Sequence, residues 1–132
     1  MTTNIAPLSR PRLWRFLAVV MLAVVVTLSL VPDPPQPPGL LSWDKLQHTT
    51  AYAFLAWWFL QSWEGRRPFF WCVFLVAVGC GIEGLQALTA VRQPSILDAI
   101  ANLLGVAMGG LIWRGPLGGV LSRLDALTWT QA

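Results

Sequence analysis

Long apolar runs constrain this chain more than any other feature of its sequence. A helix needs about 20 mainly apolar residues to cross roughly 30 Å of hydrocarbon. Four stretches approach that length, and we expect transmembrane helices over residues 13–31, 45–63, 69–90 and 96–112. Only 11% of the residues are charged, against about a quarter in soluble domains, so the chain lacks the surface of a water-exposed fold. The sequence therefore predicts an all-α protein: a single-domain, integral membrane four-helix bundle.

The first run leaves a cleaved signal peptide open as an alternative, because Arg10, Arg12 and Arg15 form a basic leader. The apolar run is long, however, and it ends at Val31 in front of prolines rather than at a small-residue cleavage site. We therefore expect the first run to be a retained membrane anchor.

The positions of Lys and Arg predict the orientation, because cytoplasmic loops carry the excess of these residues. With the N-terminus in the cytoplasm, only Lys45 and Arg92 of the nine basic residues lie outside. We thus expect a multi-pass protein with both termini cytoplasmic, and the formal net charge of +3 indicates topology rather than nucleic-acid binding. The expected inner residues are Arg10, Arg12, Arg15, Arg66, Arg67, Arg114 and Arg123.

The connections between the runs are short. Residues 31–40 hold five prolines and predict a stiff, extended outer strap. Residues 64–68 predict a tight inner turn, and Ser95 is placed to cap the fourth helix. A short amphipathic C-terminal tail is expected on the inner surface, because apolar residues recur there at helical spacing. These are Leu117, Val120, Leu121, Leu124 and Leu127.

Polar residues interrupt the last three runs, and each run has them on one helical face. A charge at bilayer depth costs on the order of 2.5 to 3.5 kcal/mol, so such residues must face the bundle interior. With a rise of about 1.5 Å per residue, all of them fall in the outer half of the membrane. We therefore predict one polar pocket that opens toward the outer leaflet. Its predicted ligand-binding residues are Asp44, Lys45, His48, Tyr52, Glu83, Gln86, Arg92, Asp98 and Asn102.

Small residues recur every four positions on the fourth run, at Ala101, Gly105 and Gly109. Such a ladder lets two helices approach closely. It predicts a packing seam that brings Asp98 and Asn102 near the other polar stripes.

The order and spacing of the polar residues carry a family resemblance. Asp44-Lys45-x-x-His48 with Tyr52 is followed by Glu83-x-x-Gln86, and then by a third group within residues 92–109. The pattern, over roughly residues 44–110, resembles the VanZ-like family of small bacterial membrane proteins, named after a teicoplanin-resistance protein. The resemblance implies a bacterial plasma (inner) membrane protein linked to the cell envelope, but no known reaction. The third group comprises Arg92, Ser95, Asp98, Asn102, Gly105 and Gly109.

Several residues have more than one reading. His48 is expected to hydrogen-bond Glu83 or Asp98, and proton transfer or metal ligation are its alternatives. One histidine and no usable cysteine argue against a metal, so we predict no metal and no cofactor. Glu83 is either a buried ion-pair partner or the main functional carboxylate. Lys45 and Arg92 either anchor the helices at the rim or grip a phosphate or carboxylate.

Two functions follow. The first is a non-catalytic envelope protein that binds a lipid-linked or amphiphilic anionic molecule, such as a lipid-linked cell-wall precursor or a glycopeptide, and influences teicoplanin susceptibility. The second is an enzyme acting on a lipid head group, with Glu83, His48 and Asp98 as acid, base or metal ligands. No nucleophile stands out, so the first is favoured. A proton-coupled carrier, which would require a homo-oligomer, is a third reading.

Overall fold

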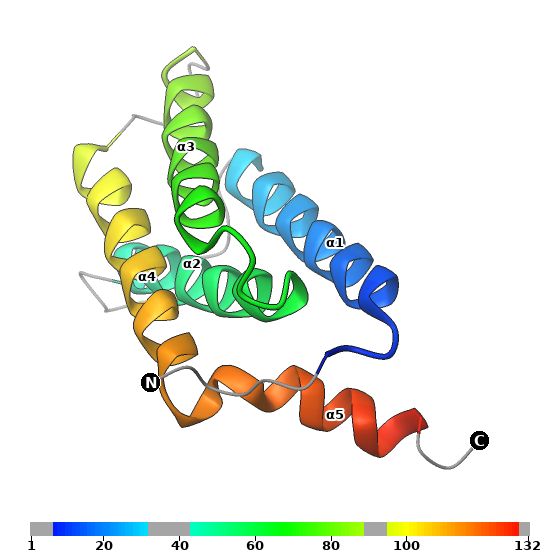
Figure 1. Ribbon diagram of the computed structural model, residues 1–132. Coiled ribbons are helices and arrows are strands. Elements are labelled where there is room, and N and C mark those ends of the chain that lie inside the picture. The colour runs from blue at the N-terminus through cyan, green and yellow to red at the C-terminus, as the bar shows by residue number, and fades with distance from the viewer. Residues whose placement is uncertain (1–6, 32–42, 89–94, 130–132) are drawn as a thin grey trace.

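The computed structural model describes residues 7–31, 43–88 and 95–129, and this part of the chain is helical with no strand. Its four long helices agree with the expected spans to within three residues at each end, which confirms the all-α prediction. The expected proline strap lies outside the described residues. In chain order the elements are α1 (Pro11–Leu30), α2 (Trp43–Ser62), α3 (Pro68–Ala87), α4 (Ile96–Arg114), η1 (Pro116–Gly119) and α5 (Val120–Trp129) (Figure 1).

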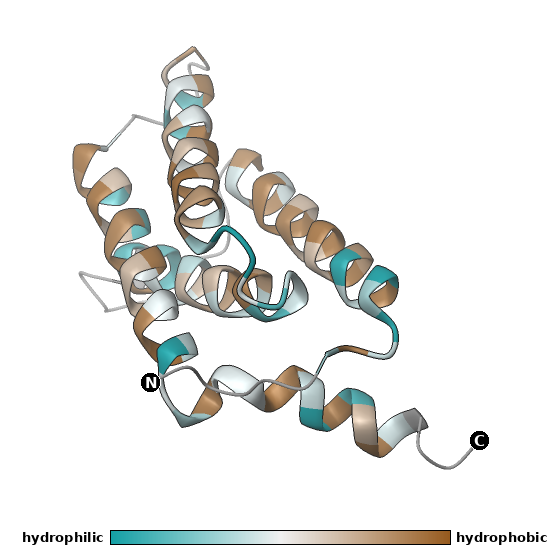
Figure 2. Cartoon of the chain, viewed as in Figure 1, coloured by the Kyte–Doolittle hydropathy of each residue, from teal (hydrophilic) through white to brown (hydrophobic). Residues whose placement is uncertain are grey.

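Three of the long helices, α1, α3 and α4, are long and apolar enough to cross a membrane, with mean hydropathies of 2.3, 1.8 and 1.7 over their most apolar stretches. The fourth, α2, has equal length but more polar residues. It is the central helix, because it packs against α1, α3, α4 and α5. Figure 2 shows the polar start of α2, whereas the other three long helices are mainly apolar along their length. A helix surrounded by other helices needs less apolar surface than one facing lipid.

The long helices alternate in direction. Phe59 of α2 contacts Trp71 of α3 (ring centroids 5.5 Å apart), whereas Tyr52 lies beside Gly79, so α2 and α3 are antiparallel. The turn expected over residues 64–68 therefore joins the two helices as an antiparallel hairpin. Its turn requires a glycine at Gly65, where φ is +66° and a Cβ atom would lie 2.6 Å from the indole ring of Trp113. The indole belongs to α4, so the turn is also a contact point between the hairpin and the fourth helix.

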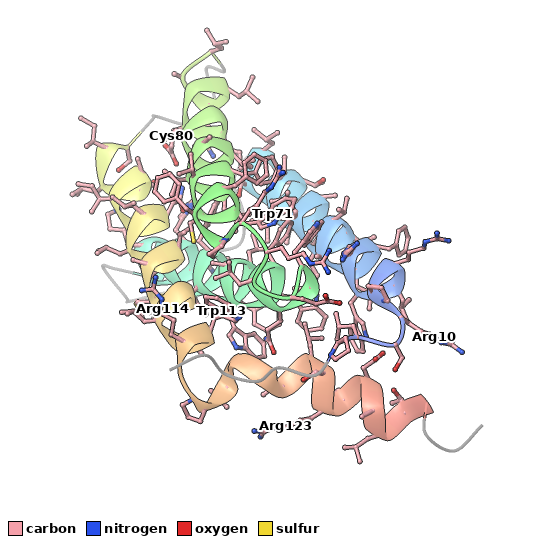
Figure 3. The ribbon with its side chains drawn as sticks, in the orientation of Figure 1. Arg10, Trp71, Cys80, Trp113, Arg114 and Arg123 are labelled. Atoms are coloured by element: carbon pink, nitrogen blue, oxygen red, sulfur yellow. The ribbon has the colours of Figure 1, made fainter. Side chains whose placement is uncertain are left out.

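The alternation gathers most arginines at one end of the bundle, here called the arginine end. Arg15 of α1 donates its Nε–H to the carbonyl of Ser62 at 3.2 Å, so α1 begins where α2 ends. In Figure 3, Arg10, Arg114 and Arg123 lie on the same side of the molecule, away from Cys80. The opposite end holds the start of α2, the end of α3 and the start of α4, and we call it the polar end.

The C-terminal tail is helical, as expected, and it lies across the arginine end (Figure 1). Its apolar residues do not form one buried stripe, however. Leu121 is buried against the bundle, whereas Leu117, Leu124 and Leu127 are exposed. The protein-facing side is built instead around Leu121 and Asp125, one helical turn apart, because Asp125 bonds to the beginning of α1.

Candidate functional site

The close approach of α2 and α4 sets the geometry of the polar end. Gly105 and Gly109 of α4 lie directly on the backbone of α2, and a Cβ at either would collide with the carbonyl of Thr49 or Ala53. The predicted small-residue seam is therefore confirmed. The seam holds the two helices parallel, so that successive turns of α4 lie beside successive turns of α2: Gly105 at Thr49 and Gly109 at Ala53.

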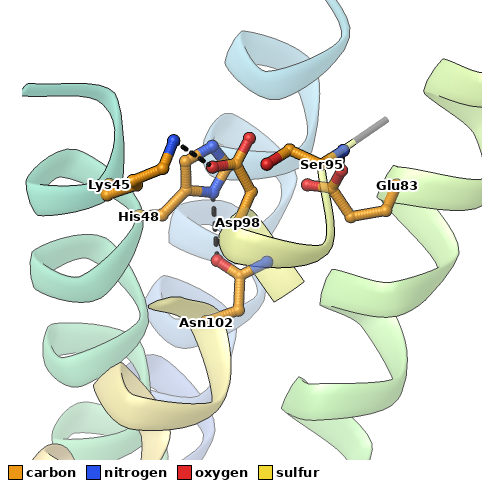
Figure 4. Close-up of polar contacts among 6 residues, drawn as sticks. All are labelled: Lys45, His48, Glu83, Ser95, Asp98 and Asn102. Carbon is orange, nitrogen blue, oxygen red and sulfur yellow. Dashed lines mark hydrogen bonds and ion pairs between the residues drawn. The ribbon is translucent and has the colours of Figure 1, made fainter. Parts of the chain in front are cut away.

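Two polar pairs continue this seam toward the polar end (Figure 4). Lys45 Nζ lies 3.1 Å from Asp98 Oδ1, and His48 Nδ1 lies 3.0 Å from Asn102 Oδ1. Asn102 and Asp98 are almost completely buried, whereas the Lys45 side chain keeps 38% of its surface exposed. Because the Asn102 partner is a carbonyl oxygen, His48 donates its Nδ1–H in this bond.

Glu83 brings α3 to the same place. It is 8% exposed, and its Oε2 accepts the backbone N–H of Ser95 at 3.2 Å. Ser95 occupies the expected N-cap position of α4, but the expected side-chain cap hydrogen bond is not formed. The capping prediction was wrong in this respect, and the contact that the structure shows at Ser95 is the one from its backbone N–H to the carboxylate of Glu83. The other oxygen, Oε1, is buried and has no hydrogen-bond partner within the described ranges.

Three helices thus converge on one small volume. One ligand atom from each of His48, Glu83 and Asp98 lies within 4.8 Å of the other two, and all three residues are buried. The sequence-based expectation that polar stripes of three helices face one another holds for these residues. We call His48, Glu83 and Asp98, with Lys45 and Asn102 as their partners, the polar cluster.

The remaining predicted residues lie around or outside the polar cluster. Tyr52 is buried one turn below His48, and its hydroxyl has no hydrogen-bond partner in the described part of the chain. Gln86 points to α1, where its Nε2 donates to the carbonyl of Ser29 at 2.7 Å. Asp44 belongs to the first turn of α2, but its side chain lies outside the described residues, as does all of Arg92.

Sequence reasoning missed a third buried carboxylate, Asp125, at the arginine end. Asp125 is 1% exposed and accepts the backbone N–H of Ser9 and the indole N–H of Trp14, the latter at 2.8 Å. The available signal was its position one turn after Leu121, on the apolar face of the expected amphipathic helix, because a carboxylate on such a face needs a partner. The partner itself lies more than 100 residues away in sequence.

The polar cluster combines an imidazole, two carboxylates and an ammonium group in a site largely shielded from water. Such a set can bind a polar head group, transfer a proton or ligate a cation. Ser95 contributes its backbone N–H to the cluster. No protein-family model, characterised protein or solved structure matched this chain. The resemblance to the VanZ-like family therefore rests on the motif residues alone.

Proposed function

We propose that this chain is a multi-pass protein of a bacterial plasma membrane, with four crossings and both termini in the cytoplasm. The alternating helix directions support this topology, because they put the beginning of α1, the end of α4 and the arginines listed above at one end of the bundle. An excess of arginines at one end is typical of the cytoplasmic side. The polar end then lies at the outer leaflet.

At that leaflet the protein binds the anionic head group of a lipid-linked or amphiphilic molecule. The observation that carries this proposal is the buried polar cluster, in which the half-exposed ammonium of Lys45 at the rim can contact the anionic group and the unsatisfied Oε1 of Glu83 can accept a hydrogen bond from a hydroxyl or amide of the ligand. Polar residues inside a membrane protein are costly and usually mark functional sites. A seam of glycines that holds Asp98 and Asn102 in place is consistent with a preorganised site.

The resemblance to the VanZ-like family points to a role in the cell envelope. Glycopeptides act on lipid-linked wall precursors at the outer surface of the plasma membrane, where the polar cluster is expected to lie. A protein that binds such a precursor, or the glycopeptide itself, would alter teicoplanin susceptibility without catalysing a reaction.

The alternative is an enzyme that acts on a lipid head group. The approach of His48, Glu83 and Asp98 to within 4.8 Å favours it, because an imidazole beside carboxylates can act in acid–base catalysis. An enzyme would convert a lipid substrate into a product of different mass, whereas a binding protein would retain its ligand unchanged.

Susceptibility and binding measurements test the proposal together. Cells producing Glu83→Gln or His48→Gln should contain normal amounts of protein but lose any change in teicoplanin susceptibility that the unsubstituted chain confers. Glu64→Gln, the same chemical change at the arginine end, is the matched control and should behave as the unsubstituted chain. A polyprenyl diphosphate should bind the purified chain and be recovered intact. Equal loss of abundance in both cluster variants would instead mean that the cluster is a scaffold.

A further inference from the structure

The charges of the polar cluster do not favour an anion by themselves. Glu83 and Asp98 contribute two carboxylates, and Lys45, the one cation beside them in the described part of the chain, is already paired with Asp98. Two like charges brought together in a low-dielectric site repel each other and any incoming phosphate. A bound cation would remove both difficulties.

We propose that His48, Glu83 and Asp98 bind a divalent transition-metal ion, such as Zn²⁺ or Mn²⁺, and that this ion holds the anionic head group. The inference rests on the proposed function for its second part, the head group, and on the geometry alone for its first. Transition-metal ions bound by one imidazole and two carboxylates keep open positions for a further ligand. A phosphate oxygen is a suitable ligand for such a position.

The spacing of the three side chains fits a small ion. Zn²⁺ binds nitrogen and oxygen ligands at about 2.0 to 2.2 Å, so ligand atoms on one ion lie at most about 4.4 Å apart. The three atoms here lie within 4.8 Å of one another, and small side-chain rotations would bring them onto a common ion. They come from α2, α3 and α4, so a bound ion would also cross-link three helices.

Two of the three ligands are oriented by a neighbour, as is usual in metal sites. Asn102 accepts the Nδ1–H of His48, which makes Nε2 the nitrogen suited to ligate a metal. The backbone N–H of Ser95 fixes Oε2 of Glu83, while Oε1 is the buried oxygen without a partner. An unsatisfied, nine-tenths buried carboxylate oxygen beside an imidazole is an independent sign that the cluster accepts a ligand.

Lys45 is the group that a metal would displace. Its ammonium lies 3.1 Å from Asp98 Oδ1, and its side chain reaches the protein surface. When Asp98 ligates the ion, Lys45 is released to contact the head group. The nitrogen ligand and the small number of carboxylates favour Zn²⁺ or Mn²⁺ over Ca²⁺, which takes six to eight oxygen ligands.

The test is a Zn²⁺ titration of the full chain, purified in nanodiscs of zwitterionic lipid and stripped with a chelator. Calorimetry should give about one equivalent of tightly bound Zn²⁺, and Mn²⁺ should compete. Glu83→Gln and His48→Gln should each weaken binding by at least about tenfold, and Asn102→Ala by a similar factor through His48. Glu64→Gln should bind as the unsubstituted chain does. Circular dichroism and elution volume check that each variant is folded.

Less than about a tenth of an equivalent in the unsubstituted chain would overturn the metal site. So would Zn²⁺ binding that neither cluster substitution changes, because the ion would then lie elsewhere. A polyprenyl diphosphate added with and without Zn²⁺ separates this inference from the proposed function. Zn²⁺ binding without the diphosphate binding would leave the metal site standing and refute the head-group function. Diphosphate binding that a chelator does not affect would refute the role of the metal and leave the function standing.

Discussion

The two ends of the bundle both bury carboxylates, but they satisfy them to different degrees. At the arginine end, Asp125 receives hydrogen bonds from the Ser9 backbone and the Trp14 indole. At the polar end, Glu83 receives one bond from Ser95, and its second oxygen has no partner among the described residues. An unsatisfied buried acceptor costs about 1 to 3 kcal/mol, whereas a satisfied one contributes to stability. Burial alone therefore does not distinguish a functional acid from a structural one, whereas incomplete hydrogen bonding of a buried carboxylate points to a functional role.

Position in the fold agrees with this distinction. Asp125 joins the C-terminal helix to the beginning of α1, so it fastens two distant parts of the chain together. The negative charge also lies at the positive N-terminal end of the α1 dipole. Glu83 lies among other ionisable groups that come from three helices. The comparison predicts that substitutions at Asp125 change stability and that substitutions at Glu83 change binding.

The largest effect is expected at the seam that connects the two ends. Gly109→Leu would drive a side chain into the carbonyl of Ala53, and we expect a loss of about 3 kcal/mol or more in unfolding free energy. Gly110→Leu is the matched control, because no atom lies within 4 Å of a Cβ there. Unfolding by denaturing detergent, followed by far-UV circular dichroism, measures both. Equal stability of the two variants would contradict the seam.

Asp125→Ala should give the next largest effect. It leaves the donors of Ser9 and Trp14 without their acceptor, and we expect a loss of about 2 to 3 kcal/mol. The same unfolding assay measures it, and proteolysis at the C-terminal helix should become faster. A stability equal to that of the unsubstituted chain would show that Asp125 does not hold the arginine end together.

Stability should also fall in acid through Asp125. Burial raises the pKa of this carboxyl group, but hydrogen bonds from Trp14 and from the backbone of Ser9 and Arg10 more than offset it, so its pKa lies below the ordinary value. The carboxylate therefore stabilises the fold above about pH 4, and this contribution is lost as the pH falls through the folded-state pKa. Asp125→Ala should show a flatter decline in unfolding free energy from pH 5 to 2.5. Parallel curves for the two proteins would be the contrary result.

Trp14→Phe should have a smaller effect, because it removes one of the bonds to Asp125 and keeps most of the ring. We expect a loss of about 1 kcal/mol in unfolding free energy. In the Asp125→Ala background the same substitution should cost less, because the bond is already absent. Additive losses in this double-mutant cycle would mean that the indole and the carboxylate do not interact.

The sequence predicted the polar end better than the arginine end, and the reason is physical. The cost of charge in a membrane forces residues such as His48, Glu83 and Asp98 to face one another, so their helical spacing was sufficient. Nothing comparable acts on Asp125, whose partners in α1 follow from tertiary packing. The hydrogen bond from the Gln86 side chain to the backbone carbonyl of Ser29 depends on tertiary packing in the same way. So does the missing side-chain cap at Ser95. The central position of α2 was also not predicted, because hydropathy reports exposure to lipid rather than helix order.

Glu83→Gln tests the central claim most directly, because it removes the charge and keeps the shape and the bond from Ser95. Its unfolding free energy should stay within about 1 kcal/mol of the unsubstituted chain, since Oε1 has no described partner to lose. Binding of the polyprenyl diphosphate in the presence of Zn²⁺, measured on the same purified preparation, should fall at least about tenfold, because the variant loses one ligand of the ion that holds the diphosphate. A large loss of stability would show that Glu83 serves the fold as Asp125 does, and unchanged binding of the diphosphate would contradict its role in binding.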